Sequence, residues 1–164
     1  MVRPVLATDA MNRIDVGAPV VGAAEVDISA EPELVWDVLT AFDRWPTWNP
    51  DIKSISMHGD VAAGSEFRWK AGPGTITSTI QEVDPPRRIT WTGRTLGIRA
   101  VHVWWLEPSD GVTTVLTEES YAGVVARVFR QTLQKALDRA LDNALRCLKA
   151  EVERRAEHRE AMRA

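Results

Sequence analysis

The chain reads Asp43-Arg44-Trp45-Pro46-Thr47-Trp48-Asn49-Pro50 at the point that decides its fold, with two indoles and two prolines in eight residues. Each proline fixes its own φ and disfavours helical geometry in the residue before it, so no long helix crosses this stretch. Trp45 and Trp48 are three positions apart and share one face of a single helical turn, where they cover a large apolar area. We therefore expect a rigid aromatic corner that plugs one mouth of a curved sheet.

A strand and a short helix lead into this corner. Alternating positions over 20–29 predict a first strand with one buried face. Ser29 is the expected helix cap, and Pro32 suits the first turn of a helix over 30–42. The apolar stripe of that helix consists of Leu34, Val35, Val38, Leu39 and Phe42.

Strand-like runs separated by short turn signals follow Pro50. They cover residues 51–58, 65–71, 74–84, 87–94, 98–107 and 112–121. Because the separators are too short for parallel crossovers, consecutive strands should pair antiparallel in a meander.

The end of the chain predicts one long amphipathic helix. No proline or glycine follows Gly123, and apolar residues recur there at steps of three and four. A helix over 123–148 would span roughly 39 Å, and strands of ten residues span about 33 Å. The helix is therefore long enough to lie across the whole sheet.

Composition indicates one globular domain. The 164 residues include 45% hydrophobic and 26% charged residues, and the net charge of −3 gives no basic footprint for nucleic acid. Cys147 is the only cysteine, which rules out an internal disulfide and fits a reducing, cytoplasmic setting. No apolar run is long enough for stable membrane insertion. We expect a flexible tail over 1–18, the domain over 19–150, and a charged, frayed helix end over 151–164.

The order of these elements resembles the START-like or SRPBCC superfamily, in its polyketide cyclase/dehydrase and lipid-transport branch. Local matches are 35–39 running into Trp45-Pro46, the turn and strand over 84–91, and 106–108 with 111–113. The resemblance implies an α+β helix-grip fold, in which a curved antiparallel sheet of about seven strands wraps around the long C-terminal helix, with two short helices after the first strand. That scaffold serves lipid and hormone carriers, cyclases, oxygenase domains and chaperone activators, so it specifies chemistry poorly.

In such a fold, alternate strand residues point at the helix and line the natural ligand site. Aligning each strand on its most apolar face, and adding the helix stripe, selects the ligand-binding candidates Phe67, Trp69, Ile76, Ser78, Ile80, Ile89, Trp91, Trp104, Leu106, Val115, Thr117, Tyr121, Phe129, Leu133 and Leu137. Trp105 has the opposite parity and should cover the outer face.

His102 and Glu119 are the candidate catalytic residues, since they fall on the inner face of neighbouring strands. A turn centred near 109–111 brings them opposite each other. The carboxylate would then orient the imidazole and favour its protonated form, giving an acid/base pair suited to aldol-type cyclisation or dehydration. The alternative is that the pair forms only a structural polar layer.

Other site types find little support. His58, His102 and His158 fall in separate elements, so no metal site is expected, and no glycine-rich loop opens a helix to bind a phosphorylated cofactor. Arg127, Arg130 and Arg139 should form a solvated helix face.

Three functions follow from these patterns. The first is a carrier or sensor, monomeric or homodimeric, that encloses a hydrophobic small molecule such as a lipid, polyketide or aromatic metabolite. The second is a polyketide cyclase/dehydratase that uses His102 and Glu119. The third is a protein-interaction module that uses the aromatic corner or the end of the helix.

Overall fold

The computed structural model describes residues 13–163. In chain order they form β1 (Val20–Ile28), α1 (Pro32–Thr40), the 3-10 turn η1 (Phe42–Arg44), α2 (Trp45–Trp48), β2 (Ser54–Met57), β3 (Glu66–Lys70), β4 (Thr75–Asp84), β5 (Arg88–Thr95), β6 (Ile98–Ser109), β7 (Val112–Ala122), α3 (Val124–Val128) and α4 (Arg130–Arg163). Residues 1–12, most of the predicted tail, lie outside the described residues.

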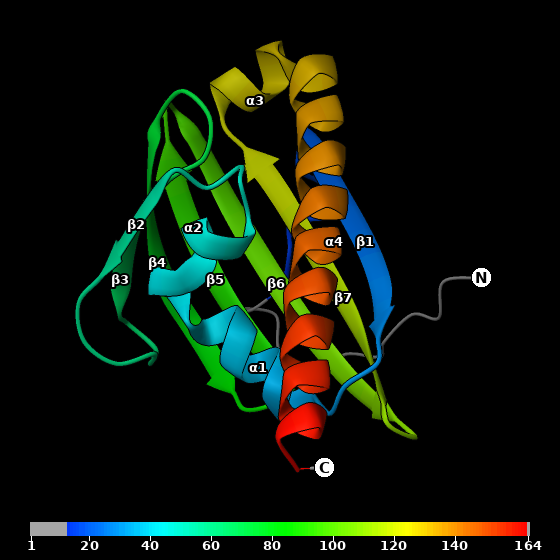
Figure 1. Cartoon of the computed structure of the whole chain (residues 1–164). Helices are drawn as coiled ribbons and strands as arrows, with labels where there is room; N and C mark the ends of the chain where they lie inside the picture. Colours follow the sequence, from blue (N-terminus) through cyan, green and yellow to red (C-terminus); the bar gives the residue numbers. More distant parts are fainter. Residues whose placement is uncertain (1–12, 164) are drawn as a thin grey trace.

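The strands form one seven-stranded antiparallel sheet, as predicted. Its order is β1-β7-β6-β5-β4-β3-β2, a meander from β2 to β7 that β1 joins at the far edge. Helices α1, α2 and α4 lie on the same face of this curved sheet (Figure 1). The chain therefore has the predicted α+β architecture, with two short helical segments after the first strand and a long C-terminal helix on the sheet.

Helix α4 packs most closely on β1 and α1. Leu137 and Leu141 form a small cluster with Val20, and a Cβ placed on Gly22 would lie only 3.0 Å from the Leu137 side chain. Glycine is therefore the residue that lets helix and strand approach here. Further along α4 the side chains Leu145, Leu148 and Val152 are buried in the main core.

The aromatic corner packs onto the inner face of the sheet. The Phe42 ring centroid lies 4.7 Å from that of Phe67, and the Trp45 centroid lies 5.8 Å from that of Trp91. The Trp45 indole N–H donates a 2.8 Å hydrogen bond to the Leu39 carbonyl, so this buried ring leaves no polar atom unpaired. The ring centroids of Trp48 and Trp45, which lie on the same helical turn, are 6.4 Å apart. The corner is thus a packed aromatic unit, and it covers one part of the inner face.

Several predicted boundaries are wrong. Glu31 rather than Ser29 is the N-cap of α1, and no side chain caps that helix. The terminal helix is divided, because Phe129 leaves helical geometry between α3 and α4. It also extends to Arg163, and Val152, beyond the predicted end at Leu148, is fully buried.

Two further findings concern the ends and surfaces of the fold. The backbone N–H of Asp15 donates to the Ser120 hydroxyl, which fixes the start of the described chain against β7. Within the described residues, no helix is long and apolar enough to cross a membrane.

Candidate functional site

The strand registers place the predicted inner-face residues on one face of the sheet. Ile80 is opposite Trp91, Trp91 is opposite His102, and His102 is opposite Glu119, so these four form one row across β4, β5, β6 and β7. The predicted pairing of His102 with Glu119 is therefore confirmed as strand geometry. Trp105 lies on the other face, where the Arg88 guanidinium stacks 4.1 Å from its ring centroid.

A buried polar cluster surrounds His102. Its Nε2 lies 2.7 Å from the Thr117 Oγ1, and its Nδ1 lies 3.6 Å from a Glu119 carboxyl oxygen, beyond hydrogen-bond distance. Tyr121 donates a hydrogen bond to the Glu119 carboxyl group. His102 is 6% exposed and Glu119 8% exposed, so the cluster is almost entirely out of water.

Burial controls the protonation of this cluster. It lowers the pKa of His102 to about 3 and raises the pKa of Glu119 to about 8, although the hydrogen bond from Tyr121 acts in the opposite direction on Glu119. Burial first, and then the neighbouring Glu119, raise the pKa of Tyr121. The expectation that Glu119 keeps the imidazole protonated is thus wrong, because desolvation outweighs attraction between the two groups. Both shifts favour the neutral form of the group near pH 7.

Small side chains form the next row across the sheet. Ser78 is opposite Gly93, Gly93 is opposite Ala100, and Ala100 is opposite Tyr121. The Trp69 indole N–H donates a 3.0 Å hydrogen bond to the Ser78 hydroxyl at one side of this row. On β3 the row ends at Phe67, and it lies directly beside the row that contains Trp91 and His102.

Burial of the ligand-binding candidates changes along the sheet. Those that are fully buried are Phe67, Ser78, Ile80, Ile89, Trp91, Trp104, Leu106, Val115, Thr117 and Leu137. Those that are half-buried are Trp69, Ile76, Tyr121 and Leu133, and Phe129 is 56% exposed. The partly exposed candidates belong to the end of the sheet near α3, so the inner face is closed at one end and accessible at the other.

Two buried nitrogens of this face have no hydrogen-bond partner among the described residues. They are Nδ1 of His102 and the indole Nε1 of Trp104, whose rings lie 5.3 Å apart. An unpaired buried N–H costs about 1–3 kcal/mol, so such atoms usually meet water or a ligand. Strand parity predicted that both side chains lie on the inner face, but only the structure shows that these two nitrogens are unpaired.

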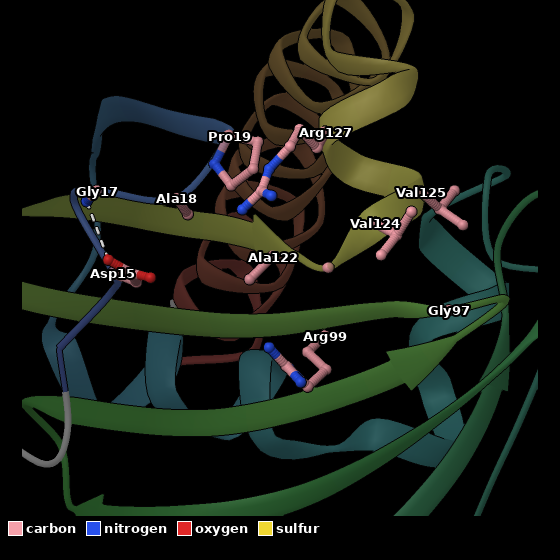
Figure 2. A pocket seen from close by; sticks show the side chains of 11 residues that line it. Asp15, Gly17, Ala18, Pro19, Gly97, Arg99, Ala122, Val124, Val125 and Arg127 are labelled. Carbon is pink, nitrogen blue, oxygen red and sulfur yellow. Dashed lines mark hydrogen bonds between the residues drawn. The ribbon is translucent and has the colours of Figure 1, made fainter.

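Two hollows lie at the accessible end, on the surface of the molecule. One hollow, of about 620 Å³, lies between the residues before β1, the start of β6 and α3. Arg99, Val125 and Arg127 are among the residues that line it (Figure 2). The other, of about 550 Å³, is lined by 94–99 at the β5–β6 turn. Neither hollow is lined by any residue that the sequence assigned to the ligand. Sequence reasoning assigned several candidates to this end of the molecule but missed the residues that line these two hollows.

The described residues contain no group of three or more His, Cys, Asp or Glu side chains that could hold a metal ion. His102 is one member of a hydrogen-bonded pair rather than of a ligand set.

Solved structures share this fold. A hypothetical protein from Helicobacter pylori superposes with a TM-score of 0.76 at 19% identity, covering 89% of this chain and 99% of that chain. The Zhui aromatase/cyclase from Streptomyces sp. R1128 gives a TM-score of 0.72 at 19% identity, covering 83% and 94%. A START superfamily protein from Mycobacterium smegmatis gives 0.71 at 15% identity, covering 82% and 97%. At these identities the likeness shows the fold alone.

Sequence comparison is more specific. A search of curated proteins finds no match. The family model described as polyketide cyclase/dehydrase and lipid transport matches residues 20–153, from the first residue of β1 to the residue after the buried Val152 of α4. The chain therefore belongs to the polyketide cyclase/dehydrase and lipid-transport family of the START-like, SRPBCC superfamily.

Proposed function

We propose that this protein binds an uncharged hydrophobic small molecule on the inner face of the sheet, at the end near α3. The observation that carries this proposal is the row of small residues Ser78, Gly93 and Ala100, which ends at the rings of Phe67 and Tyr121, with the Trp69 indole hydrogen-bonded to Ser78. A lipid, polyketide or aromatic metabolite would lie over this row and contact Trp91.

The polar cluster would select a neutral ligand. Because burial keeps both His102 and Glu119 uncharged at pH 7, no fixed charge there can balance a ligand carboxylate or phosphate. A hydroxyl or carbonyl oxygen, by contrast, would accept a hydrogen bond from the unpaired Trp104 N–H. A carrier or sensor needs nothing more than this combination of apolar wall and single polar contacts.

The half-buried residues would form the entrance. Leu133 on α4 and Ile76 on β4 are each partly exposed, whereas the residues deeper along the same elements are fully buried. A ligand would enter between these side chains and displace the first turns of α4 outward. The segment that would move is the start of α4, directly after the break in the helix at Phe129.

A titration with the uncharged dye N-phenyl-1-naphthylamine tests the proposal. Binding should quench tryptophan fluorescence and transfer energy to the dye, and Ala100→Phe should weaken it at least roughly tenfold by filling the row of small residues. Ala23→Phe, the same change at an exposed position of β1, is the control. Equal binding by both variants would contradict the proposed position.

A second candidate function is catalysis of cyclisation or dehydration. It is favoured by one observation, the direct pairing of His102 with Glu119. A neutral imidazole can remove a proton next to a carbonyl, and a protonated carboxyl group can donate one to a departing hydroxyl. His102→Ala should then abolish turnover of a poly-β-carbonyl substrate and leave its binding intact. An unchanged rate would contradict this second candidate, and only the carrier or sensor function would remain.

The compartment and assembly are also proposals. The lone, half-buried Cys147 supports a reducing compartment such as the cytoplasm. We propose a monomer or homodimer, which sedimentation equilibrium would distinguish.

A further inference from the structure

Four large apolar side chains are exposed together at the end of the molecule near α3. Leu96 at the β5–β6 turn is 65% exposed, and Val124, Val128 and Phe129 are 75%, 68% and 56% exposed. We call these four residues the apolar tip. Single exposed apolar residues are ordinary, but a group on adjoining segments marks an interaction surface.

The two segments of the apolar tip are in contact. A Cβ on Gly97 would lie 3.1 Å from a Val125 methyl group, and a Cβ on Gly123 would lie 2.5 Å from the Gly97 carbonyl oxygen. Figure 2 shows Val124 and Val125 directly above Gly97 at the end of the hairpin. Helix α3 therefore lies against the β5–β6 turn, and the exposed apolar residues of both belong to one surface.

Leu96 is held there in an unfavourable backbone conformation. Its φ is 45° and that of Gly97 is 78°, so both central residues of this two-residue turn are left-handed. Turns of this kind favour Asn-Gly or Asp-Gly, because a bulky side chain is strained at positive φ. A leucine that is strained and also exposed contributes little to the stability of the fold, which indicates a function for it.

The charges of the chain are divided between the two ends of the sheet. The segments 70–75, 94–99 and 123–130 at the end with the apolar tip contain the cations Lys70, Arg94, Arg99, Arg127 and Arg130 and no Asp or Glu. The chain that enters β2 beside Lys70 adds one anion, Asp51, and one cation, Lys53. The loops at the opposite end comprise 28–31, 58–65, 84–87 and 107–111. They contain the anions Glu31, Asp60, Asp84, Glu107 and Asp110, with Arg87 as the one Lys or Arg. A chain with a net charge of −3 thus has one strongly cationic end.

The N-terminal arm brings one acidic group near this end. Asp15 lines the 620 Å³ hollow together with Arg99 and Arg127, and its carboxylate accepts a 2.9 Å hydrogen bond from the Gly17 N–H. The two carboxylates Asp15 and Asp51 beside six cations leave this end cationic.

We propose that the apolar tip docks the protein onto an anionic lipid bilayer surface. Leu96, Val128 and Phe129 enter the boundary between headgroups and acyl chains, while Arg94 and Arg127 contact lipid phosphates. Apolar residues flanked by arginines are the pattern of surface-bound segments, which need no membrane-spanning helix. An acidic protein would match the charge, but the apolar residues stand on a turn and a short helix, which suits insertion into a soft surface. The inference does not depend on a ligand for the inner face.

Vesicle sedimentation tests this proposal with the full chain. The wild type should bind vesicles of phosphatidylcholine with 30% phosphatidylglycerol and bind pure phosphatidylcholine vesicles much more weakly. Arg94→Gln with Arg127→Gln should reduce binding by roughly fivefold for each arginine removed. Arg159→Gln, an exposed arginine on the last turns of α4, is the charge control and should leave binding unchanged.

A second pair of variants tests the apolar contribution. Leu96→Asn relieves the strained turn, so a loss of vesicle binding in that variant cannot result from unfolding. Combined with Val128→Gln it should reduce binding at least roughly tenfold. Met162→Gln, which replaces an equally exposed apolar residue at the other end of α4, should not reduce it. Absence of wild-type binding to the anionic vesicles, or equal binding by the tip variants and the controls, would overturn the proposal.

Discussion

Replacing Glu119 with glutamine should change how the stability of the protein depends on pH. Glu119 is 8% exposed, and burial raises its pKa from 4.5 to about 8. Between these values the folded chain keeps the proton that the unfolded chain releases, so stability falls as pH rises. The slope is at most about 1.4 kcal/mol per pH unit.

The useful window is pH 6.5 to 8. His102, whose pKa is lowered to about 3, contributes mainly below pH 6.5, because above that value its imidazole becomes progressively neutral in the unfolded chain as well. Below pH 6.5 the unfolded chain takes up a proton that folded His102 refuses, so stability then falls with falling pH. Over pH 6.5–8 the wild type should therefore lose up to about 2 kcal/mol through Glu119.

Urea unfolding followed by tryptophan fluorescence measures this difference. The free energy of unfolding of Glu119→Gln should be nearly constant from pH 6.5 to 8, while that of the wild type falls. Glu118→Gln is the matched control, since its side chain is on the opposite face of β7 and should leave the wild-type slope in place. A wild type without a slope, or Glu119→Gln with the same slope as the wild type, would refute the assignment of a buried, protonated Glu119.

Three further substitutions test packing and strain, each by urea unfolding. Phe42→Ala removes a ring that contacts Trp45, Phe67 and Trp91 and should cost about 3–5 kcal/mol, whereas a loss below about 1 kcal/mol would mean that the corner is not part of the core. Gly22→Ala brings a Cβ to 3.0 Å from Leu137 and should cost about 1–3 kcal/mol, less when Leu137→Ala is also present; additive effects would contradict the contact. Leu96→Asn should stabilise the protein by about 0.5–1 kcal/mol, and destabilisation would contradict the strained turn at φ 45°.

The sheet was largely predictable because its information is local. Turn residues fixed the ends of the strands, and period-two alternation fixed their faces. The pairing of His102 with Glu119 followed from counting outward from the turn at Asp110 and Gly111. Family resemblance and residue pattern agreed on the same architecture, and the family match over 20–153 confirms it.

The errors arose where distant segments decide the local structure. Serine is a common helix cap, but the backbone N–H of Ser29 donates a hydrogen bond to the Glu153 carboxylate of α4, and the helix begins later. No proline or glycine marks the interruption at Phe129, which coincides with the contact of α3 on Gly97. Val152 is one apolar residue in a charged run, and it is buried because α4 packs into the main core there.

The candidate site was predictable in its membership but not in its chemistry. Parity identified His102 and Glu119, yet their protonation depends on the depth of burial, which a sequence does not give. The same limit applies to the apolar tip. Phe129 was predicted to contact the ligand and is 56% exposed, because the exposure of a residue becomes visible only when its neighbours are known.

The central claim, a hydrophobic ligand on the inner face near α3, is tested most directly by the indole N–H resonances of the tryptophans. Adding N-phenyl-1-naphthylamine to ¹⁵N-labelled protein should shift the indole signals of Trp69, Trp91 and Trp104. The signals of Trp36 and Trp105 should stay in place. Shifts confined to Trp36 or Trp105, or changes only at residues 94–99 around the surface hollow, would contradict the account.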